Sequence, residues 1–292
     1  MFEDVVDVSA RTLSLDGIDF TLRFGYPYNL VDSPDIEPQH IHDQYEFYVN
    51  LSGDVSFLVD TQIYAIESGD VVIIKPNTLH KCIYNKSCKM EHFVLWLSAG
   101  EDSPLVSFIG KKEFIPIIRL DEEHKASLKL CLGRLHSMLV NRSENSNLMT
   151  TVLLMQFIGL LADAPSSVAP DTSGFPIKFR NVLEIIDQKF TELNSVEDIA
   201  KASFVAPSTL NRWFRENLHM TPYEFLEKKK FALAKQLLSS GVSVTEVGNR
   251  LGFCGTSYFI SKFKRHFGET PLAYKHRSEQ GIPKIDTKKN KK

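Results

Sequence analysis

Four residues in the first third of the chain could act together on a metal ion or a polar ligand: His40, His42, Glu46 and His80. His40 and His42 lie two positions apart, so on a β-strand their side chains would project from the same face. Neighbouring strands could bring Glu46 and His80 to that face. Three imidazoles and a carboxylate suit a divalent transition metal. The same groups could instead hydrogen bond a polar molecule, or pair with one another in the core.

A second set of side chains, in the last third, suits contact with nucleic acid. Residues 175–292 carry 21 Lys and Arg against 12 Asp and Glu, whereas residues 1–174 carry 13 against 24. This asymmetry predicts a polyanion partner for the second half only. Arg212 and Asn211 could make bidentate contacts to guanine and adenine. The full candidate set is Ser208, Asn211, Arg212, Arg215, Thr256, Ser257, Ser261, Lys262, Lys264 and Arg265.

The two groups of candidate DNA contacts differ in reach. Those from Thr256 onward are mainly short, so we expect phosphate contacts there through Lys262, Lys264 and Arg265 rather than base reading at long range. For an isolated helix, such a polar face could equally be solvated. We interpret Lys228 to Lys230 as a solvated run or as charges that steer the DNA backbone.

The segment from Ser243 to Tyr274 is predicted to be a helix-turn-helix followed by a further helix. Ser243 and Glu246 have capping-box spacing. Gly252 can adopt the positive φ that a sharp helix exit needs. A second helix from about Thr256 would bury Phe259 and Phe263, four residues apart.

The same pattern occurs earlier, in Ser195 to Phe225, at an offset of 48 and then 49 residues. Two tandem units are therefore expected. Between them, Thr221, Pro222 and Glu224 predict a capped helix that runs to Ser239. Its 18 residues would span about 27 Å, enough to place two recognition helices in successive major grooves about 34 Å apart.

Short β-rich runs separated by turn signals fill residues 1–120 and predict an antiparallel barrel or sandwich. The expected strands are Phe20–Phe24, Glu46–Leu51, Val55–Val59, Gln62–Ile66, Asp70–Ile74 and Glu91–Leu97. Two helices should follow within Asp121–Asp163, where an apolar stripe at helical spacing could pack on the barrel, form a dimer seam, or do both. That stripe comprises Leu128, Cys131, Leu132, Leu135, Met138 and Leu139.

With 292 residues, 43% of them hydrophobic, the chain should form two domains. We expect them at residues 1–163 and 175–277, with a Pro/Ser/Gly-rich linker at 164–174 and a disordered basic tail at 278–292. Cys82, Cys88, Cys131 and Cys254 lack paired spacing, which favours reduced thiols. We find no signal peptide and no apolar run long enough for a membrane span, so a cytoplasmic protein is expected.

The tandem repeat resembles the DNA-binding domain of AraC/XylS-type bacterial transcription regulators. The matching positions are Ile199-Ala200, Leu210-x-Arg212-x-Phe214-Arg215, Pro222-x-x-Phe225, Ala234-x-x-Leu237-Leu238, Gly252-Phe253, Ser257-x-Phe259, Phe263-Lys264, Gly268, Thr270-Pro271 and Tyr274. The chain departs from the family pattern at His219, Lys230, Gly248, Gly255 and Ser261. The order of His40, His42, Glu46, Gly53, Gly69, Pro76, His80 and Asn85 resembles the two cupin motifs, although Thr78 replaces a glycine and His80 comes one residue early.

These resemblances imply a cupin-like all-β domain with a helical hairpin, followed by an all-α domain with two helix-turn-helix units and a linker helix. They imply a homodimeric regulator, an activator rather than an enzyme, that binds promoter DNA, RNA polymerase and a small effector such as a sugar or related metabolite. We expect His40, His42, Glu46 and His80 to bind the effector without a cofactor. The alternatives are a metal-binding cupin enzyme or a metal sensor fused to the DNA-binding domain, and an amino-terminal half that only oligomerises.

Overall fold

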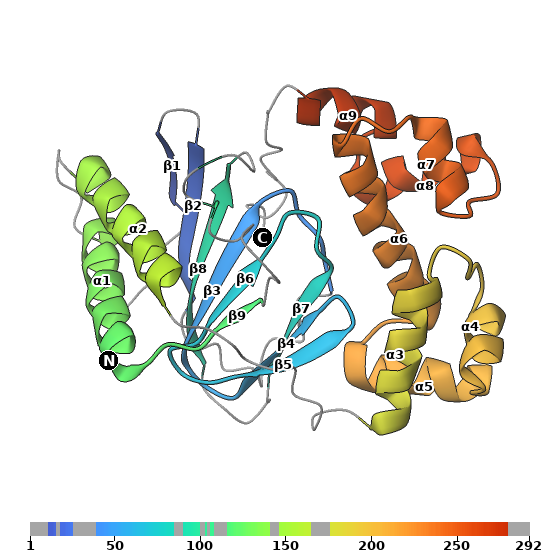
Figure 1. The fold of residues 1–292 in the computed structure, drawn as a ribbon, viewed down its shortest axis with the longest axis horizontal. Helices are drawn as coiled ribbons and strands as arrows, with labels where there is room; N and C mark the ends of the chain where they lie inside the picture. The colour runs from blue at the N-terminus through green and yellow to red at the C-terminus, as the bar shows by residue number, and fades with distance from the viewer. Residues whose placement is uncertain are drawn as a thin grey trace.

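In the computed structural model, strands occupy the first part of the chain and helices the last part. The structure describes residues 11–15, 18–25, 39–84, 90–99, 103, 106–107, 116–140, 146–164 and 176–279. Figure 1 shows a pair of helices on one side of the strands and the remaining helices, in yellow to red, on the other side. The two-domain fold class predicted from the sequence is confirmed.

The strands form two antiparallel sheets. The larger has the order β1-β2-β8-β3-β6-β9 and the smaller the order β5-β4-β7. The larger sheet contains β1 (Arg11–Leu15), β2 (Ile18–Gly25), β3 (Tyr45–Ser52), β6 (Val71–Ile74), β8 (Glu91–Ser98) and β9 (Ile117–Ile118). The smaller contains β4 (Val55–Val59), β5 (Gln62–Ile66) and β7 (His80–Tyr84). All six predicted strands are present, whereas β1, β7 and β9 were not predicted.

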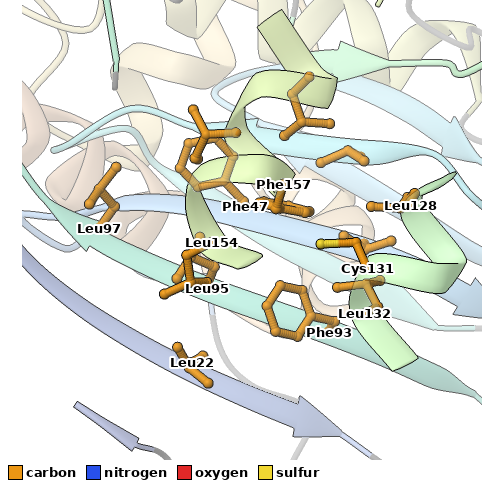
Figure 2. Packing of buried hydrophobic residues seen from close by; sticks show 14 of the residues in the cluster. Leu22, Phe47, Phe93, Leu95, Leu97, Leu128, Cys131, Leu132, Leu154 and Phe157 are labelled. Atoms are coloured by element: carbon orange, nitrogen blue, oxygen red, sulfur yellow. The ribbon is translucent and has the colours of Figure 1, made fainter. Parts of the chain in front are cut away.

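A helical hairpin covers the outer face of the larger sheet. It consists of α1 (Glu122–Val140) and α2 (Ser146–Asp163). Phe157 of α2 packs with ring centroids 6.0 Å from Phe47 and 5.7 Å from Phe93, and Leu132 of α1 is buried in the same cluster (Figure 2). The described members of the predicted α1 stripe therefore make intramolecular contacts: Leu128, Cys131, Leu132, Leu135 and Met138. On α2, a different set stays exposed: Leu148, Met149, Val152 and Met155.

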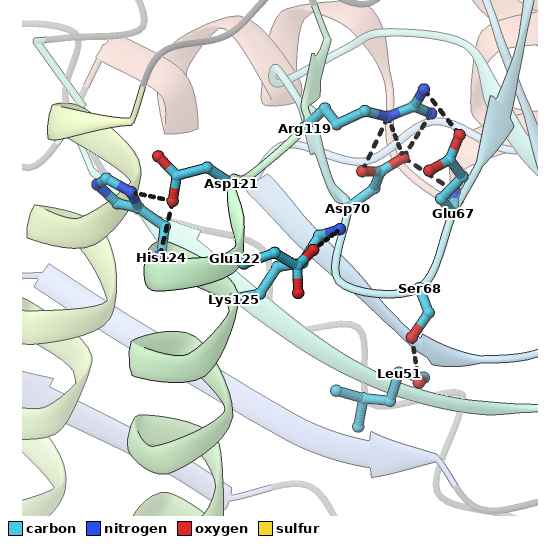
Figure 3. A network of polar contacts seen from close by, with 9 residues as sticks. All are labelled: Leu51, Glu67, Ser68, Asp70, Arg119, Asp121, Glu122, His124 and Lys125. Atoms are coloured by element: carbon cyan, nitrogen blue, oxygen red, sulfur yellow. Dashed lines mark hydrogen bonds and ion pairs between the residues drawn. The ribbon is translucent and has the colours of Figure 1, made fainter.

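A polar network joins this hairpin to the sheets (Figure 3). The buried Asp70 accepts hydrogen bonds from Arg119, whose guanidinium also contacts Glu67 at 2.9 Å. Two residues later, Asp121 accepts the backbone N–H of His124 at 2.9 Å and caps α1. A buried carboxylate needs such a charged partner. The network therefore fixes the path between β9 and α1.

The helical part follows the predicted order. Its elements are α3 (Ile177–Lys189), α4 (Val196–Ser203), α5 (Pro207–Leu218), α6 (Pro222–Ser239), α7 (Val244–Arg250), α8 (Thr256–Phe267) and α9 (Pro271–Glu279). Thr221 and Glu224 form the predicted capping box of α6. Ser243 caps α7, but the Glu246 carboxylate pairs with Arg250 instead of completing a box.

The two parts share buried apolar surface. Leu58, Ile63 and Leu79 of the strand region lie in one cluster with Phe179 and Phe214 of the helical region. The sequence did not predict this contact. Of the linker predicted at 164–174 and the tail predicted at 278–292, only residues 164, 278 and 279 are among those described. The domain bounds therefore stay a prediction.

Two further observations concern the described residues. None of their helices is both long and apolar enough to span a membrane. Cys82, Cys131 and Cys254 form no disulfide within the described part of the chain, whereas Cys88 lies outside it.

Candidate DNA surface and histidine cluster

The first candidate DNA surface lies on α5. Leu210, Phe214 and Leu218 are fully buried at helical spacing and anchor the helix. His219 closes it in the left-handed conformation, at φ 55°, where the family pattern has a glycine that adopts this conformation without steric cost. The exposed predicted residues are Ser208, Arg212 and Arg215. Asn211 is partly buried and donates to the Pro207 carbonyl at 2.9 Å.

The second candidate surface lies on α8, anchored by the buried Phe259 and Phe263. The predicted residues exposed there are Ser257, Ser261, Lys264 and Arg265, and Thr256 is partly buried. Lys262 differs, because its Nζ pairs with Glu227 at 2.7 Å and lies 5.5 Å from the ring of Tyr223. Its role in phosphate contact remains a prediction that would require this pair to open.

The interpretation of Lys228 to Lys230 as a solvated run is wrong. Lys229 and Lys230 are buried on α6. Lys229 pairs with Asp187 at 2.6 Å, and Lys230 donates to Asn194 Oδ1 at 2.8 Å. The Lys228 ammonium donates to the Gln39 carbonyl. A run of positive charge is therefore used for contacts inside the protein.

The four predicted cluster residues converge. One donor atom from each of His40, His42, Glu46 and His80 lies within 4.8 Å of the others. His40 and His80 form an isolated antiparallel bridge, with backbone N–O distances of 3.0 and 3.1 Å. His40 and His42 thus lie on an irregular segment before β3 rather than on the predicted strand, but their alternate spacing still turns both inward. Their ring centroids lie 4.3 and 4.9 Å from that of His80.

Glu46 is at the centre of this histidine cluster. Its Oε2 atom lies 2.9 Å from His42 Nε2 and 3.6 Å from His80 Nε2, and it accepts a 2.8 Å hydrogen bond from Trp96 Nε1. Burial alone would raise the pKa of Glu46, but the imidazoles of His42 and His80 hold that pKa well below its usual value. Burial lowers the pKa of His42. The imidazoles therefore favour the ionised Glu46 carboxylate, whereas burial disfavours the charged form of His42.

The outer nitrogens of two cluster histidines are fixed by the backbone. His42 Nδ1 lies 2.9 Å from the Gln44 carbonyl oxygen, and His80 Nδ1 lies 2.9 Å from that of Thr78. A carbonyl oxygen only accepts hydrogen bonds, so both Nδ1 atoms carry the proton. The Nε2 atoms of both rings are thereby turned toward the Glu46 carboxylate. His80 Nε2 is buried and has no hydrogen-bond partner among the described residues.

Next to the cluster, a short segment contacts the helical region through residues that the sequence did not single out. Asp43 pairs with Lys235 of α6 and, at 2.9 Å, with Arg277 of α9. Ile41 packs against the apolar clusters of both helix-turn-helix units. On β7, Lys81 Nζ donates to the Leu218 carbonyl at the end of α5, at 2.8 Å. The only signal of this contact in the sequence is that Gln39, Ile41 and Asp43 alternate with His40 and His42, which places their side chains on the opposite face of the segment.

Comparisons with known proteins cover both regions. A family profile described as an AraC-like ligand binding domain matches residues 32–158, and one described as a helix-turn-helix domain matches residues 199–277. The uncharacterized HTH-type transcriptional regulator YdeC of Bacillus subtilis strain 168 is 26% identical over 257 residues, which is 82% of this chain and 86% of the relative. The HTH-type transcriptional activator RhaR of Mannheimia succiniciproducens is 22% identical over 247 residues, covering 82% and 87%.

Solved structures also resemble the chain. An AraC-type DNA-binding domain protein from Chromobacterium violaceum is 26% identical, covers 35% of this chain and 93% of its own, and gives a TM-score of 0.33. ToxT from Vibrio cholerae O395 is 12% identical, covers 90% of this chain and 98% of its own, and gives a TM-score of 0.35.

Proposed function

The chain belongs to the AraC family of DNA-binding transcription regulators, and from this premise we propose that a small ligand in the histidine cluster controls how it binds promoter DNA. The exposed side chains of α5 and α8 support DNA contact, with Arg212 as the main base reader and Lys264 and Arg265 on phosphates. The 18-residue α6 separates the two units by about one DNA turn.

One observation carries the control by a ligand. Residues 39–43 alternate between the cluster and the helical region. His40 and His42 point into the cluster, whereas the Gln39 carbonyl, Ile41 and Asp43 contact the helical region. A ligand that shifts either histidine must move the backbone between these contacts. The presence of a ligand in the histidine cluster and the position of α6 are thereby linked.

The strength of this link comes from burial. Burial alone would raise the pKa of Asp43, but Lys235 and Arg277 hold that pKa below its usual value. Removing one partner of a buried ion pair leaves an uncompensated charge, which costs about 3 to 5 kcal/mol. The contact is therefore stiff enough to transmit a small displacement.

The finer parts of this proposal are the following. The sequence favours a sugar or a related metabolite as the effector, held by the cluster side chains as hydrogen-bonding partners. RhaR carries the word activator in its name, and we extend that sign of regulation, with contact to RNA polymerase in the cytoplasm, to this chain. The proposed role contains no catalytic step. The exposed apolar face of α2, formed by Leu148, Met149, Val152 and Met155, is the proposed homodimer contact.

Selection of bound DNA from a fragment library, followed by a reporter driven by the selected site, tests this function. Wild-type protein should protect two adjacent major grooves. Asp43→Asn should alter the ligand response of the reporter, while the protein still binds the selected DNA. The matched control is Asp54→Asn, an exposed carboxylate on the turn between β3 and β4, which should change neither. The absence of any selected sequence would contradict the regulator role.

A further inference from the structure

The geometry of the histidine cluster assigns its ligand. We propose that His40, His42, Glu46 and His80 bind one divalent transition-metal ion. This inference rests on the proposed function, because it names the ligand of the site that controls DNA binding. It replaces the sugar or related metabolite favoured by the sequence.

The first argument is the direction of the ring nitrogens. Because their Nδ1 atoms donate to backbone carbonyls, His42 and His80 direct their Nε2 atoms toward the same carboxylate oxygen, at 2.9 and 3.6 Å. Two imidazole nitrogens and a carboxylate oxygen that face one another are a donor set suited to a divalent transition metal. A metal ion would also give a partner to the buried His80 Nε2.

The second argument is the fit of the distances. Ligand atoms about 2.1 Å from a metal lie about 3.0 Å apart in octahedral and about 3.4 Å apart in tetrahedral coordination. The separations of 2.9 and 3.6 Å at Glu46 Oε2 fall around these values. The largest separation among the four donor atoms, 4.8 Å, needs only side-chain adjustment.

The third argument is the layer outside the donor atoms. Metal-binding histidines usually donate their second ring nitrogen to a carbonyl or carboxylate, and the ligating carboxylate is itself hydrogen-bonded. Here the Gln44 and Thr78 carbonyls accept from the two rings, and Trp96 donates to Glu46. Imidazole and carboxylate donors together suit Zn²⁺, Fe²⁺, Co²⁺ or Ni²⁺ more than Mg²⁺ or Ca²⁺.

Titration of metal-free, untagged full-length protein with Co²⁺ tests the site. Dialysis against a chelator removes bound metal, and the visible absorption of protein-bound Co²⁺ then reports stoichiometry and coordination. We expect one equivalent per chain, and displacement of that absorption by Zn²⁺. The thermal unfolding midpoint should rise on loading, because the ion binds only the folded site.

Two variants and a control make the result specific. Glu46→Gln keeps the side-chain volume but removes the charge, and His80→Ala removes a ligand. Each should weaken Co²⁺ binding by at least about tenfold. His276→Ala, on the exposed face of α9, should leave it unchanged. Co²⁺ binding that is absent, or that survives both cluster variants, would overturn the metal site.

The same samples separate this inference from the proposed function. Circular dichroism and binding to the selected DNA show whether each variant is folded. If the protein did not bind Co²⁺ but the reporter responded to an organic ligand, the metal site would be refuted and the proposed regulatory function would stand. If the protein bound one equivalent of Co²⁺ without a change in its DNA affinity, the metal site would be supported and its regulatory role refuted.

Discussion

The two helix-turn-helix units have the same architecture but different neighbours. The first shares a buried apolar cluster with Leu58, Ile63 and Leu79 of the strand region. The second meets that region at Ile41 and through the ion pairs of Asp43. Apolar contact is tolerant of small shifts, whereas a buried ion pair depends strongly on geometry. Under the proposed function, we therefore expect the first unit to be the fixed body and the second to be the part whose position the cluster controls.

The two units also differ at the turn between their helices. Both turns use a left-handed residue, Phe204 at φ 55° in the first and Gly252 at φ 69° in the second. Phe204 is 97% exposed. A Cβ on Gly252 would lie 2.7 Å from the Thr191 carbonyl oxygen. Of the two turns, only the second is thus packed closely, against the segment between α3 and α4.

Substitution at these turns should give the largest difference in stability. Gly252→Ala combines left-handed strain with a backbone clash and should lower the free energy of unfolding by more than about 2 kcal/mol. Phe204→Gly should change it by less than about 1 kcal/mol, in the stabilising direction. Urea unfolding midpoints followed by circular dichroism measure both. Equal effects at the two turns would show that the second is not packed in this way.

The recognition helices should differ in how they read DNA. Arg212→Ala should cost about 1 to 3 kcal/mol on the selected site and relax specificity at one base pair. Lys264→Ala should weaken all sequences alike and reduce the salt slope by about one. Fluorescence anisotropy with selected and random duplexes compares them. If Arg212→Ala weakened binding to both duplexes equally, α5 would not be the base-reading helix.

The buried lysines predict a smaller, pH-dependent effect. Burial lowers the pKa of Lys81, at the contact with the first unit, and of Lys230, between the units, to about 8 in each case. Unfolded lysine keeps its proton to about pH 10.4. Between these values the unfolded chain binds more protons, so stability should rise as the pH increases from about 8 to about 10. Lys81→Met should flatten this slope in unfolding midpoints measured across the range, whereas the exposed Lys264→Met should not.

The smallest effect is expected at a position where the units differ by one methyl group. Ala200 in α4 corresponds to Gly248 in α7. A Cβ on Gly248 would lie 3.5 Å from Phe259, an ordinary van der Waals contact. Gly248→Ala should therefore stabilise by up to about 1 kcal/mol through helix propensity. A lower unfolding midpoint would show that α7 and α8 need the closer approach.

The sequence predicted the helical region well because its signals are local. Caps such as Thr221 with Glu224, and apolar pairs such as Phe259 with Phe263, determine helices within a few residues. In the strand region, β7 escaped prediction because its polar start, His80-Lys81, reflects contacts on two opposite faces. Such contacts arise only from tertiary structure.

The residues of the histidine cluster were predicted from the sequence, and its function stays a prediction. Residue types and spacing identified the four donors. The decisive features are the hydrogen bonds of the Nδ1 atoms to the Gln44 and Thr78 carbonyls and the role of Asp43. These depend on backbone positions and on residues more than 190 positions away in the chain, which no local pattern encodes.

The affinity of the full-length protein for its selected DNA, measured with and without Zn²⁺, tests the central claim most directly. Binding at one site that shifts a second site has a coupling of about fivefold or more. We expect a change of at least this size in wild type, and its loss in Asp43→Asn even though that variant still takes up one equivalent of Zn²⁺. Identical DNA affinity of the metal-free and Zn²⁺-loaded wild-type protein would contradict the account.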